Sequence, residues 1–577
     1  MLYLRIASAA LAAVLIGAAS PAPGFSPGTA DDAFTALANT YYMDSLKRNP
    51  IQATFAGLHT YDAQMGDFSA AGVQFELNND RAYLAKLHGI DRSALSQEVA
   101  IDWQILESSL NDDLLLNGTL QQWKHNPDSY AQAATAAIFG IITRDYAPLS
   151  TRAGYVIARE RQIPAVLAAG RANTTTVDAT TQLIAYQNVT GSAAFFTATV
   201  PVAFAGLHDA AIQRQLKAAN ATAKNAMLAY AAWIKARKPK GSFAIGASAY
   251  AARLKYEDGV DMSLSDYLAV GQKELARLRV QFVATAKLID SKKSPFQVYQ
   301  DISKDHPKAD QLLSAAAGDL VNLRAFIVSH QIITLPPDAN IKVVETPPFE
   351  RTTTIASFDA PGPLETVATQ TYYNVTPVDP TWTAKQKEEY LEGLSNYERP
   401  IISAHECYPG HFVNYAIDKH LTLSLTRKLN WNQAFGEGWA HYTEQMMVDE
   451  GWGNGDPKVR LAQLDEALLR AARFVVGVKI HTQGMTIAQA EDFFVSQGFQ
   501  GRQIAVEESL RGSQDAMYGY YTLGKLMILK LRSDYQKKLG ASYSLEGFHD
   551  ALLAHGDPPV PLLRPILLGS DDDGKVL

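Results

Sequence analysis

Two histidines and a glutamate lie close together in the stretch HECYPGHF, residues 405–412. In a helix with the pattern H-E-x-x-H, two histidines on one face bind zinc and the glutamate activates water. Here His411 follows His405 by six positions, which is about 120° around a regular helix, whereas a spacing of four is about 40°. A regular helix therefore cannot bring these two imidazoles to one metal ion.

The residues between the histidines predict a departure from regular helix. Pro409 has no N–H to donate to the carbonyl of His405, and its ring crowds the same turn. Gly410 permits backbone angles that other residues resist. We expect a bulge that turns His411 back toward His405, with Glu406 as the general base. Two unrelated histidines near a glutamate are the alternative, because short motifs arise by chance.

A third ligand is needed, because catalytic zinc keeps three protein ligands and one open position. The stretch NWNQAFGEGWAHYTEQMM, residues 430–447, places Glu437, His441 and Glu444 on one face of a helix. Such a stripe could face a metal or solvent, and spacing alone does not decide between them.

A later helical stretch, DAMYGYYTLGKLMILKLR, contains Tyr518 and Tyr521 at helical spacing and Arg532 some turns later. A tyrosine hydroxyl can stabilise an oxyanion, and an arginine can bind a carboxylate. Tyrosines of this kind are more often core residues. Periodicity alone does not assign them to a site.

The elements that position these residues are mainly helices. Amphipathic patterns predict helices over 95–110 and 263–282, with capping residues at Ser263 and Thr486. Two segments, 341–346 and 368–376, are rich in β-branched and aromatic residues and predict strands, separated by a Pro/Gly-rich stretch. We expect the second strand to align a peptide substrate by edge pairing.

Bulk properties narrow the class of protein. The 577-residue chain has a net charge of −7 and contains no basic run, which argues against nucleic-acid binding. Residues 1–19 resemble a secretory signal peptide, followed by a linker over 20–32. No second apolar run of membrane length is evident, so we expect an exported protein, periplasmic or secreted, with no stable membrane span after signal removal. The only cysteine is Cys407, and the sequence gives no indication of oligomeric state.

Together the motifs resemble the bacterial family known as domain of unknown function 885, whose members carry H-E-x-x-P-G-H and then E-G-W-A-x-Y. Further similar stretches are RNPIQATFAGLHTYD, VVETPPF, YYNVTPVDP and FHDALLAHGDPPVPLLR. The resemblance implies a mainly α fold similar to neurolysin and angiotensin-converting enzyme, a large two-lobed helical body with a deep cleft. The body would cover 33–577, with an N-terminal lobe over about 33–240, a metal-bearing part over about 241–577, and a small β insertion before the metal motif.

The resemblance also implies residue roles. It makes His405, His411 and Glu437 the zinc ligands, Glu406 the general base and Tyr521 the oxyanion donor, with Glu444 behind the ligands. His441, Tyr518 and Arg532 are further candidates for supporting the site or contacting substrate. This chain departs from the family in having DAM where Pro-Gly-Gln precedes the tyrosine, and in having His441 at a usually apolar position.

These observations favour an exported zinc metallopeptidase that cleaves short peptides with metal-activated water. Its partner would be a small peptide or another small molecule. A zinc amidase or esterase acting on a non-peptide substrate is one alternative, since the same chemistry serves either reaction. A helical binding protein that has lost its metal is the other.

Overall fold

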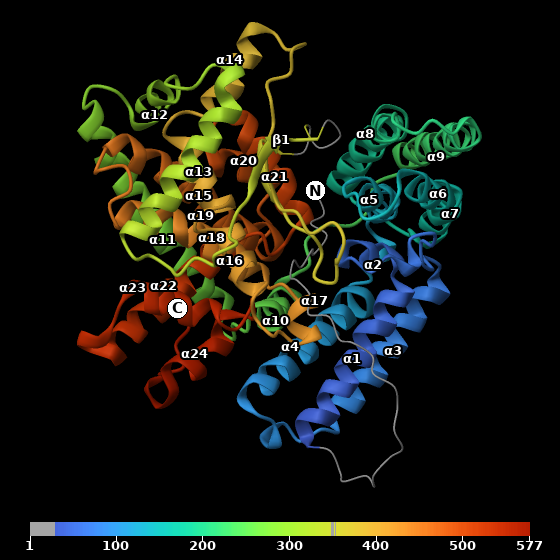
Figure 1. Ribbon diagram of the computed structural model, residues 1–577, viewed down its shortest axis with the longest axis horizontal. Coiled ribbons are helices and arrows are strands. Elements are labelled where there is room, and N and C mark those ends of the chain that lie inside the picture. The colour runs from blue at the N-terminus through green and yellow to red at the C-terminus, as the bar shows by residue number, and fades with distance from the viewer. Residues whose placement is uncertain (1–28, 348–350, 352–353) are drawn as a thin grey trace. The chain divides into compact units, whose positions relative to one another are not determined.

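The computed structural model describes residues 29–347, 351 and 354–577. The predicted signal peptide lies outside this range, as does most of the predicted linker. Helix α1 (Ala30–Arg48) begins within the last residues of that linker, because the side chain of Thr29 accepts a hydrogen bond from the backbone of Asp32 and caps the helix. Most of the described chain is helical, with one small sheet before the metal motif, so the predicted mainly α fold with a small β insertion is confirmed (Figure 1).

The chain forms two compact units. The first unit extends to Phe243 and also includes Pro361–Thr369 and Thr422–Asn430. The second unit comprises Ala244–Ala360, Gln370–Leu421 and Trp431–Leu577. The chain therefore enters the first unit again twice after leaving it.

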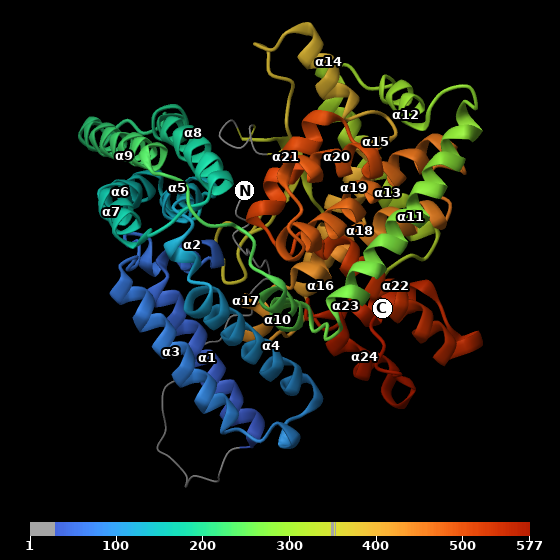
Figure 2. The same cartoon turned by 180° about the vertical axis from the view of Figure 1, so that it is seen from behind.

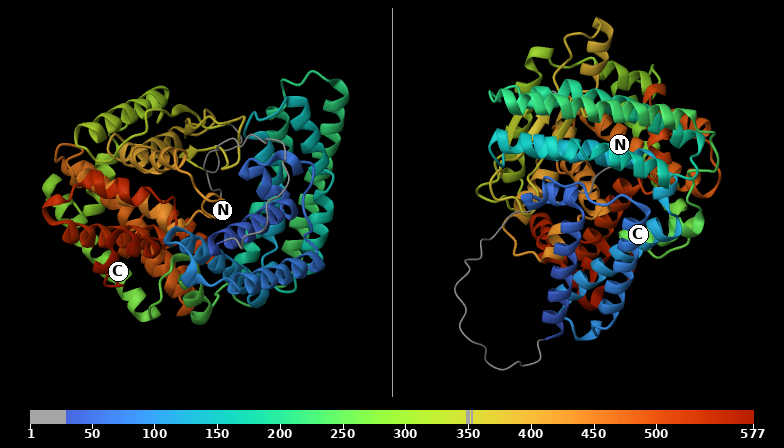
Figure 3. Two further views of the ribbon diagram at one scale, coloured as in Figure 1. Left: turned by 60° about the horizontal axis from the view of Figure 1, so that its bottom comes forward. Right: turned by 90° about the vertical axis from the view of Figure 1, so that its right-hand side faces the viewer.

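The first unit is built from helices that pack in neighbouring pairs. Helices α8 and α9 lie side by side along their length, as Figure 3 shows in teal and green, and α1, α3 and α4 pack together, as Figure 2 shows in blue. The helices of this unit are α1, α2 (Pro50–Ala56), α3 (Ala70–His88), α4 (Gln97–Asp113), α5 (Asp128–Ile142), α6 (Leu149–Glu160), α7 (Ile163–Asn173), α8 (Ala179–Ala203), α9 (Ala210–Ala236) and α17 (Leu425–Leu429).

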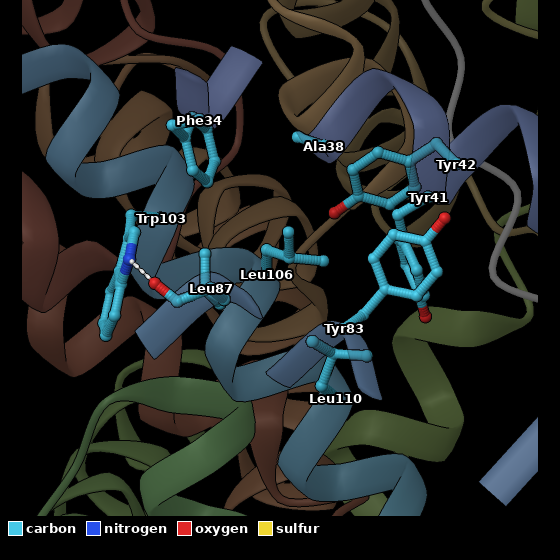
Figure 4. Close-up of a cluster of buried hydrophobic side chains, with 9 residues drawn as sticks. All are labelled: Phe34, Ala38, Tyr41, Tyr42, Tyr83, Leu87, Trp103, Leu106 and Leu110. Atoms are coloured by element: carbon cyan, nitrogen blue, oxygen red, sulfur yellow. Dashed lines mark hydrogen bonds between the residues drawn. The ribbon is translucent and has the colours of Figure 1, made fainter. Parts of the chain in front are cut away.

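An aromatic core holds α1, α3 and α4 together (Figure 4). The indole N–H of Trp103 donates to the carbonyl of Leu87 at 3.2 Å, which satisfies the polar atom of a buried ring. Leu425 and Leu429 of α17 pack against this core, which explains why residues 422–430 belong to this unit. The cluster consists of Phe34, Ala38, Tyr41, Tyr42, Tyr83, Leu87, Trp103, Leu106 and Leu110.

A polar clamp holds the segment 361–369 in the first unit. The imidazole of His59 lies between two carboxylates, with Nδ1 2.9 Å from Asp62 and Nε2 2.9 Å from Glu365. Its ring stacks on Tyr146 at 3.4 Å between centroids, and the hydroxyl of Tyr146 donates to Asp62 at 2.5 Å. Both imidazole nitrogens are therefore engaged, and Glu365 is tied to the helical body.

The second unit contains the remaining helices. One described helix, Ala309–Ser329, is long and apolar enough to cross a membrane by length and composition, a test that core helices also pass. A third of its apolar window is buried, and its Asp319 is paired with Arg399 at 2.6 Å inside the unit. The helices are α10 (Ala247–Asp258), α11 (Leu264–Ile289), α12 (Pro295–Ser303), α13 (Leu312–Ser329), α14 (Ala384–Glu392), α15 (Glu398–Glu406), α16 (His411–Asp418), α18 (Gln433–Asp449), α19 (Pro457–Thr482), α20 (Ile487–Gly498), α21 (Arg502–Gln514), α22 (Tyr520–Leu539), α23 (Leu545–Leu553) and α24 (Val560–Leu568).

The sheet of the second unit has three strands in the order β1-β3-β2. Strand β1 (Lys342–Glu345) pairs parallel with β3 (Tyr372–Val375), and β2 (Ala356–Asp359) pairs antiparallel with β3. The two predicted strands are present, but β2 lies in the stretch expected to be Pro/Gly-rich connection. Because β3 is central and paired on both sides, the prediction that it aligns substrate through a free edge is wrong.

Candidate metal centre

The HECYPGH segment is a break between two helices, so the prediction of a bulge within one helix is wrong. Helix α15 ends at Glu406 and α16 begins at His411, with a cis peptide bond between Tyr408 and Pro409. The N–H of Gly410 donates to the carbonyl of Ala404 at 2.9 Å. A Cβ at Gly410 would lie only 1.8 Å from the carbonyl oxygen of His405, so glycine is required by close approach.

The tryptophan of the second motif holds this break in place. The indole N–H of Trp439 donates to the carbonyl of Pro409 at 3.0 Å and to that of Gly410 at 3.3 Å. Trp439 is fully buried in α18, two residues after Glu437. The same helix therefore carries one candidate ligand and supports the turn that positions the other two.

The structure brings His405, His411 and Glu437 together. The Nε2 atoms of His405 and His411 lie 3.4 Å and 3.5 Å from one carboxylate oxygen of Glu437, and the three candidate ligand atoms all lie within 4.8 Å of one another. Ligands about 2.0–2.2 Å from zinc at tetrahedral angles are about 3.4 Å apart. The two distances from the Glu437 oxygen match this value and the residue types are zinc ligands, but the imidazoles, in a set that spreads to 4.8 Å, must draw closer together to bind one zinc ion.

Glu444 lies behind the ligands, about two turns after Glu437 on α18. One of its oxygens is 2.7 Å from Nδ1 of His405, and the guanidinium of Arg470 is 3.3 Å from that oxygen. A carboxylate at Nδ1 fixes the tautomer of a metal-binding histidine and orients its ring. Nε2 of His405 is thereby directed toward Glu437 and His411.

Contacts between the histidines and carboxylates of the candidate site shift the pKa values of His405 and Glu437. Burial lowers the pKa of His405, but the carboxylates of Glu437 and Glu444 outweigh burial and raise it to about 10. Burial raises the pKa of Glu437, yet the two histidines hold it well below its ordinary range. A metal must therefore compete with a proton for Nε2 of His405.

His441 supports the carboxylate behind the site and does not reach the ligands. Its Nδ1 is 3.0 Å from the second oxygen of Glu444, and the side chain is fully buried. Burial, with the nearby charge of Lys525, lowers the pKa of His441 to about 3. His441 is thus a neutral donor to Glu444 at physiological pH.

Glu406, the candidate base, extends from the last turn of α15. One carboxylate oxygen, Oε2, accepts the backbone N–H of Phe358 at 2.8 Å. Phe358 belongs to β2, so the strand that the sequence did not predict contacts the residue next to the first ligand.

Tyr521 lies beside the candidate ligands, with its ring centroid 6.4 Å from that of His405. The guanidinium of Arg511 donates to the hydroxyls of Tyr520 and Tyr521, each at 3.3 Å. Arg470 and Arg473 approach the ring of Tyr521 at 5.4 Å and 5.2 Å. Three arginines thus contact the ring and hydroxyl of Tyr521, and a tyrosine hydroxyl is a group that can donate to a developing anion.

Close contact between α18 and α22 fixes Tyr521 relative to Glu437. A Cβ at Gly524 would lie 1.6 Å from the carbonyl oxygen of Ala434, and a Cβ at Gly438 would lie 2.4 Å from Cα of Gly524. Gly438 follows Glu437, and Gly524 is one turn after Tyr521. The two glycines let the helix backbones touch and so set the distance between ligand and tyrosine.

Residues 50–567 match the family described as "Bacterial protein of unknown function (DUF885)". The chain belongs to this family. A solved structure described as a "putative lipoprotein of unknown function" from Shewanella oneidensis is 27% identical, with a TM-score of 0.79 over 93% of this chain and 99% of that chain. The "putative lipoprotein" from Colwellia psychrerythraea is 17% identical and shares the fold, with a TM-score of 0.72 over 94% of this chain and 100% of that chain. No curated protein matches the sequence.

Two candidates in this DUF885 chain are not brought to the ligands. Arg532 lies eleven residues after Tyr521, about 16 Å along α22, and it binds Tyr442, Tyr543 and Glu450, each at 3.1 Å. The ring of Tyr518 packs against Gly477 of α19 and Gly512 of α21. Arg532 and Tyr518 therefore contact other parts of the fold.

Several residues of the site were not found from the sequence. Phe358 acts through its backbone N–H, which any residue but proline provides. Arg470 is contributed by α19, whose sequence has no motif connecting it to the other two stretches. Trp439 belongs to the E-G-W-A-x-Y motif, but the role of its indole N–H depends on the turn at Pro409, which the sequence does not show.

Cys407 lies inside the motif, and its side chain packs in the interior of the protein. It is fully buried, and burial raises the pKa of its thiol well above the ordinary value. The thiol is therefore not a reactive thiolate in the folded protein.

Proposed function

We propose that this chain is an exported zinc-dependent hydrolase, a metallopeptidase that cleaves short peptides. The observation that carries the proposal is the convergence of His405, His411 and Glu437 beside Glu406. Two histidines and a glutamate are a donor set that zinc takes, and Glu406 adjoins His405 in the sequence, where such motifs carry the general base.

Each residue has a role that follows from its position. The two imidazoles and Glu437 would hold zinc, which supplies a Lewis acid that polarises a carbonyl and activates water. Glu406 accepts a proton from the attacking water and returns it to the leaving group. Tyr521 donates a hydrogen bond to the oxygen that becomes negative during attack, with Arg511 bound to its hydroxyl.

Peptides are favoured as substrates because an edge strand lies next to the base. β2 is at the edge of the sheet, and its Phe358 contacts Glu406. The outward N–H of Phe358 donates to Glu406 and the outward carbonyl of Ala356 accepts from the hydroxyl of Thr354, so an extended peptide can pair only with the remaining main-chain groups of this edge. We also propose that this chain is related to neurolysin and angiotensin-converting enzyme and that it has a deep cleft.

Export is proposed from the signal-like start of the sequence. The two solved relatives carry lipoprotein names, which supports an envelope location for this chain as well.

The test combines metal content with turnover. Purified protein is analysed for bound zinc, and a library of short peptides is then incubated with wild type, Glu406→Gln and Glu389→Gln. Glu389 is an exposed residue of α14, paired only loosely with Lys385 at 3.5 Å, and serves as a matched control. We expect about one zinc per chain, cleavage by wild type and Glu389→Gln, and a loss of at least about 100-fold in Glu406→Gln.

Other outcomes assign the protein differently. Turnover retained by Glu406→Gln would refute the assigned mechanism. Zinc binding with a blank peptide library and activity on an amide or ester panel would favour the non-peptide hydrolase. No zinc after reconstitution, with a thermal midpoint that chelator does not change, would favour a metal-free binding protein.

A further inference from the structure

The backbone of β2 alternates between facing β3 and facing away from it. The carbonyl of Ile355 accepts the N–H of Thr376 at 2.9 Å, so Ile355 faces β3. Polar backbone groups of an antiparallel strand switch sides at each residue. Ser357, opposite Asn374, therefore faces β3 as well, whereas the backbone groups of Ala356 and Phe358 face away from β3.

The outward N–H of Phe358 is used by Glu406 and not by solvent, since it donates to Oε2 at 2.8 Å. The ring of Phe358 is anchored by the helix that begins at His411, with centroids 5.8 Å from Phe412 and 5.7 Å from Tyr415. The donor is thus held by pairing with β3 on one side and by ring packing on α16 on the other.

We propose that the backbone N–H of Phe358 is the positioning donor for Glu406. A glutamate side chain has three rotatable bonds and loses much freedom when it is fixed. A hydrogen bond from an N–H to a carboxylate is charge-assisted and directional. With Oε2 held by β2, the carboxylate has one rotamer, and Oε1 is the oxygen left to accept a proton.

This inference rests on the proposed function for its catalytic consequence, but the contact itself does not. It gives the sheet a role in the chemistry, since β2 orients the base. Phe358 is therefore a positioning residue that acts through Glu406.

The first experiment tests the contact without any substrate. Amide hydrogen exchange is measured on the full-length protein, with fragmentation that resolves single amides, in wild type, Glu406→Gln and Glu406→Ala. The amide of Phe358 should exchange at least about tenfold faster in Glu406→Ala, while Glu406→Gln, whose side-chain oxygen can still accept, stays near wild type. The amide of Ser357, which faces β3, is the internal control and should not change. Equal exchange at Phe358 in wild type and Glu406→Ala would overturn the proposal.

The second experiment removes the donor itself. Proline lacks an N–H and is accepted at sheet edges where that N–H faces away from the ladder, so Phe358→Pro deletes the hydrogen bond and Phe358→Ala is the matched control that keeps it. On a substrate identified by the library, kcat of Phe358→Pro should fall about 10- to 100-fold below that of Phe358→Ala, with KM within about threefold. Equal kcat values for the two variants contradict the proposal.

The two experiments separate the inference from the proposed function. If no hydrolysis is found, the exchange measurement still decides whether β2 holds Glu406. If Phe358→Pro fails to fold, as a lowered thermal midpoint relative to Phe358→Ala would show, exchange at Phe358 in the Glu406 variants again decides.

Discussion

The contact between α18 and α22 predicts that Gly524→Ala damages both folding and chemistry. The added Cβ would lie 1.6 Å from the carbonyl oxygen of Ala434, where ordinary contact begins at 3.4 Å. The helices must therefore move apart by about 1.8 Å, unless the backbone distorts. Ala434 precedes Glu437 by three residues and Gly524 follows Tyr521 by three, so the shift changes the distance between ligand and tyrosine.

Two opposing contributions set the change in the free energy of unfolding of Gly524→Ala. Overpacking a buried contact costs about 1–3 kcal/mol, and a clash with backbone, which cannot change rotamer, belongs at the upper end. Alanine gains about 1 kcal/mol over glycine in a helix interior. We expect a net loss of about 2 kcal/mol in the free energy of unfolding, and a fall in kcat of about 100-fold or more, because misplacement by about 1 Å costs that much.

The assay compares Gly524→Ala with Gly318→Ala. Gly318 lies inside α13 of the same unit, and a Cβ there would meet nothing within 4 Å. Gly318→Ala should be neutral or more stable by up to about 1 kcal/mol, with unchanged kcat. Urea unfolding and turnover are measured for both variants. If Gly524→Ala behaves like Gly318→Ala in both, the helix contact does not set the geometry of the site.

Three further predictions concern single side chains. Glu444→Gln should weaken zinc binding about 10- to 100-fold in competition with a chelator, because a neutral amide orients His405 less firmly; an unchanged affinity would contradict this role. Tyr521→Phe should lower kcat about 100- to 1000-fold with little change in KM, and a change in KM alone would place the hydroxyl in binding. The pKa of Glu365 is lowered to about 2, since its hydrogen bonds outweigh burial, and that of His59 is raised, because Asp62 and Glu365 outweigh burial. The contacts of His59 with Asp62 and Glu365 should therefore stabilise the first unit most between about pH 4.5 and 6.5, and this stabilisation is lost as Glu365 protonates below this range and as His59 deprotonates above it. Urea unfolding of wild type and His59→Ala across pH should show the largest difference in the free energy of unfolding in this range. A difference that does not change with pH would contradict this role of the clamp.

Residue type and spacing predicted His405, Glu406 and His411 as candidates, whereas Glu437 was distinguished from His441 and Glu444 only through the family resemblance. His405, Glu406, His411 and Glu437 are the residue types that zinc hydrolysis uses, and Pro409 with Gly410 indicated irregular backbone between the histidines. The form of the irregularity was not predictable, since a helix break depends on Trp439 binding the carbonyls of the turn.

The parts that were missed depend on contacts between distant segments. The sequence ASFD of β2 is short and has only one residue with strong strand preference, so pairing with β3 and packing on α16 decide its conformation. Arg532 was a candidate because of its chemistry, but it lies about three helical turns after Tyr521, where it binds Tyr442, Tyr543 and Glu450. Gly524 is visible in the sequence, whereas its partner Ala434 is ninety residues away.

Cys407 gives the protein a built-in reporter of local opening. It is the only thiol in the sequence, it is fully buried, and its N–H donates to the carbonyl of Ser403 within the last turn of α15. A thiol reagent can reach it only when the segment around Cys407 opens. The rate of labelling therefore measures the free energy of opening at this one place in the unmodified protein, and zinc that binds His405 and His411 should slow that rate in proportion to its occupancy.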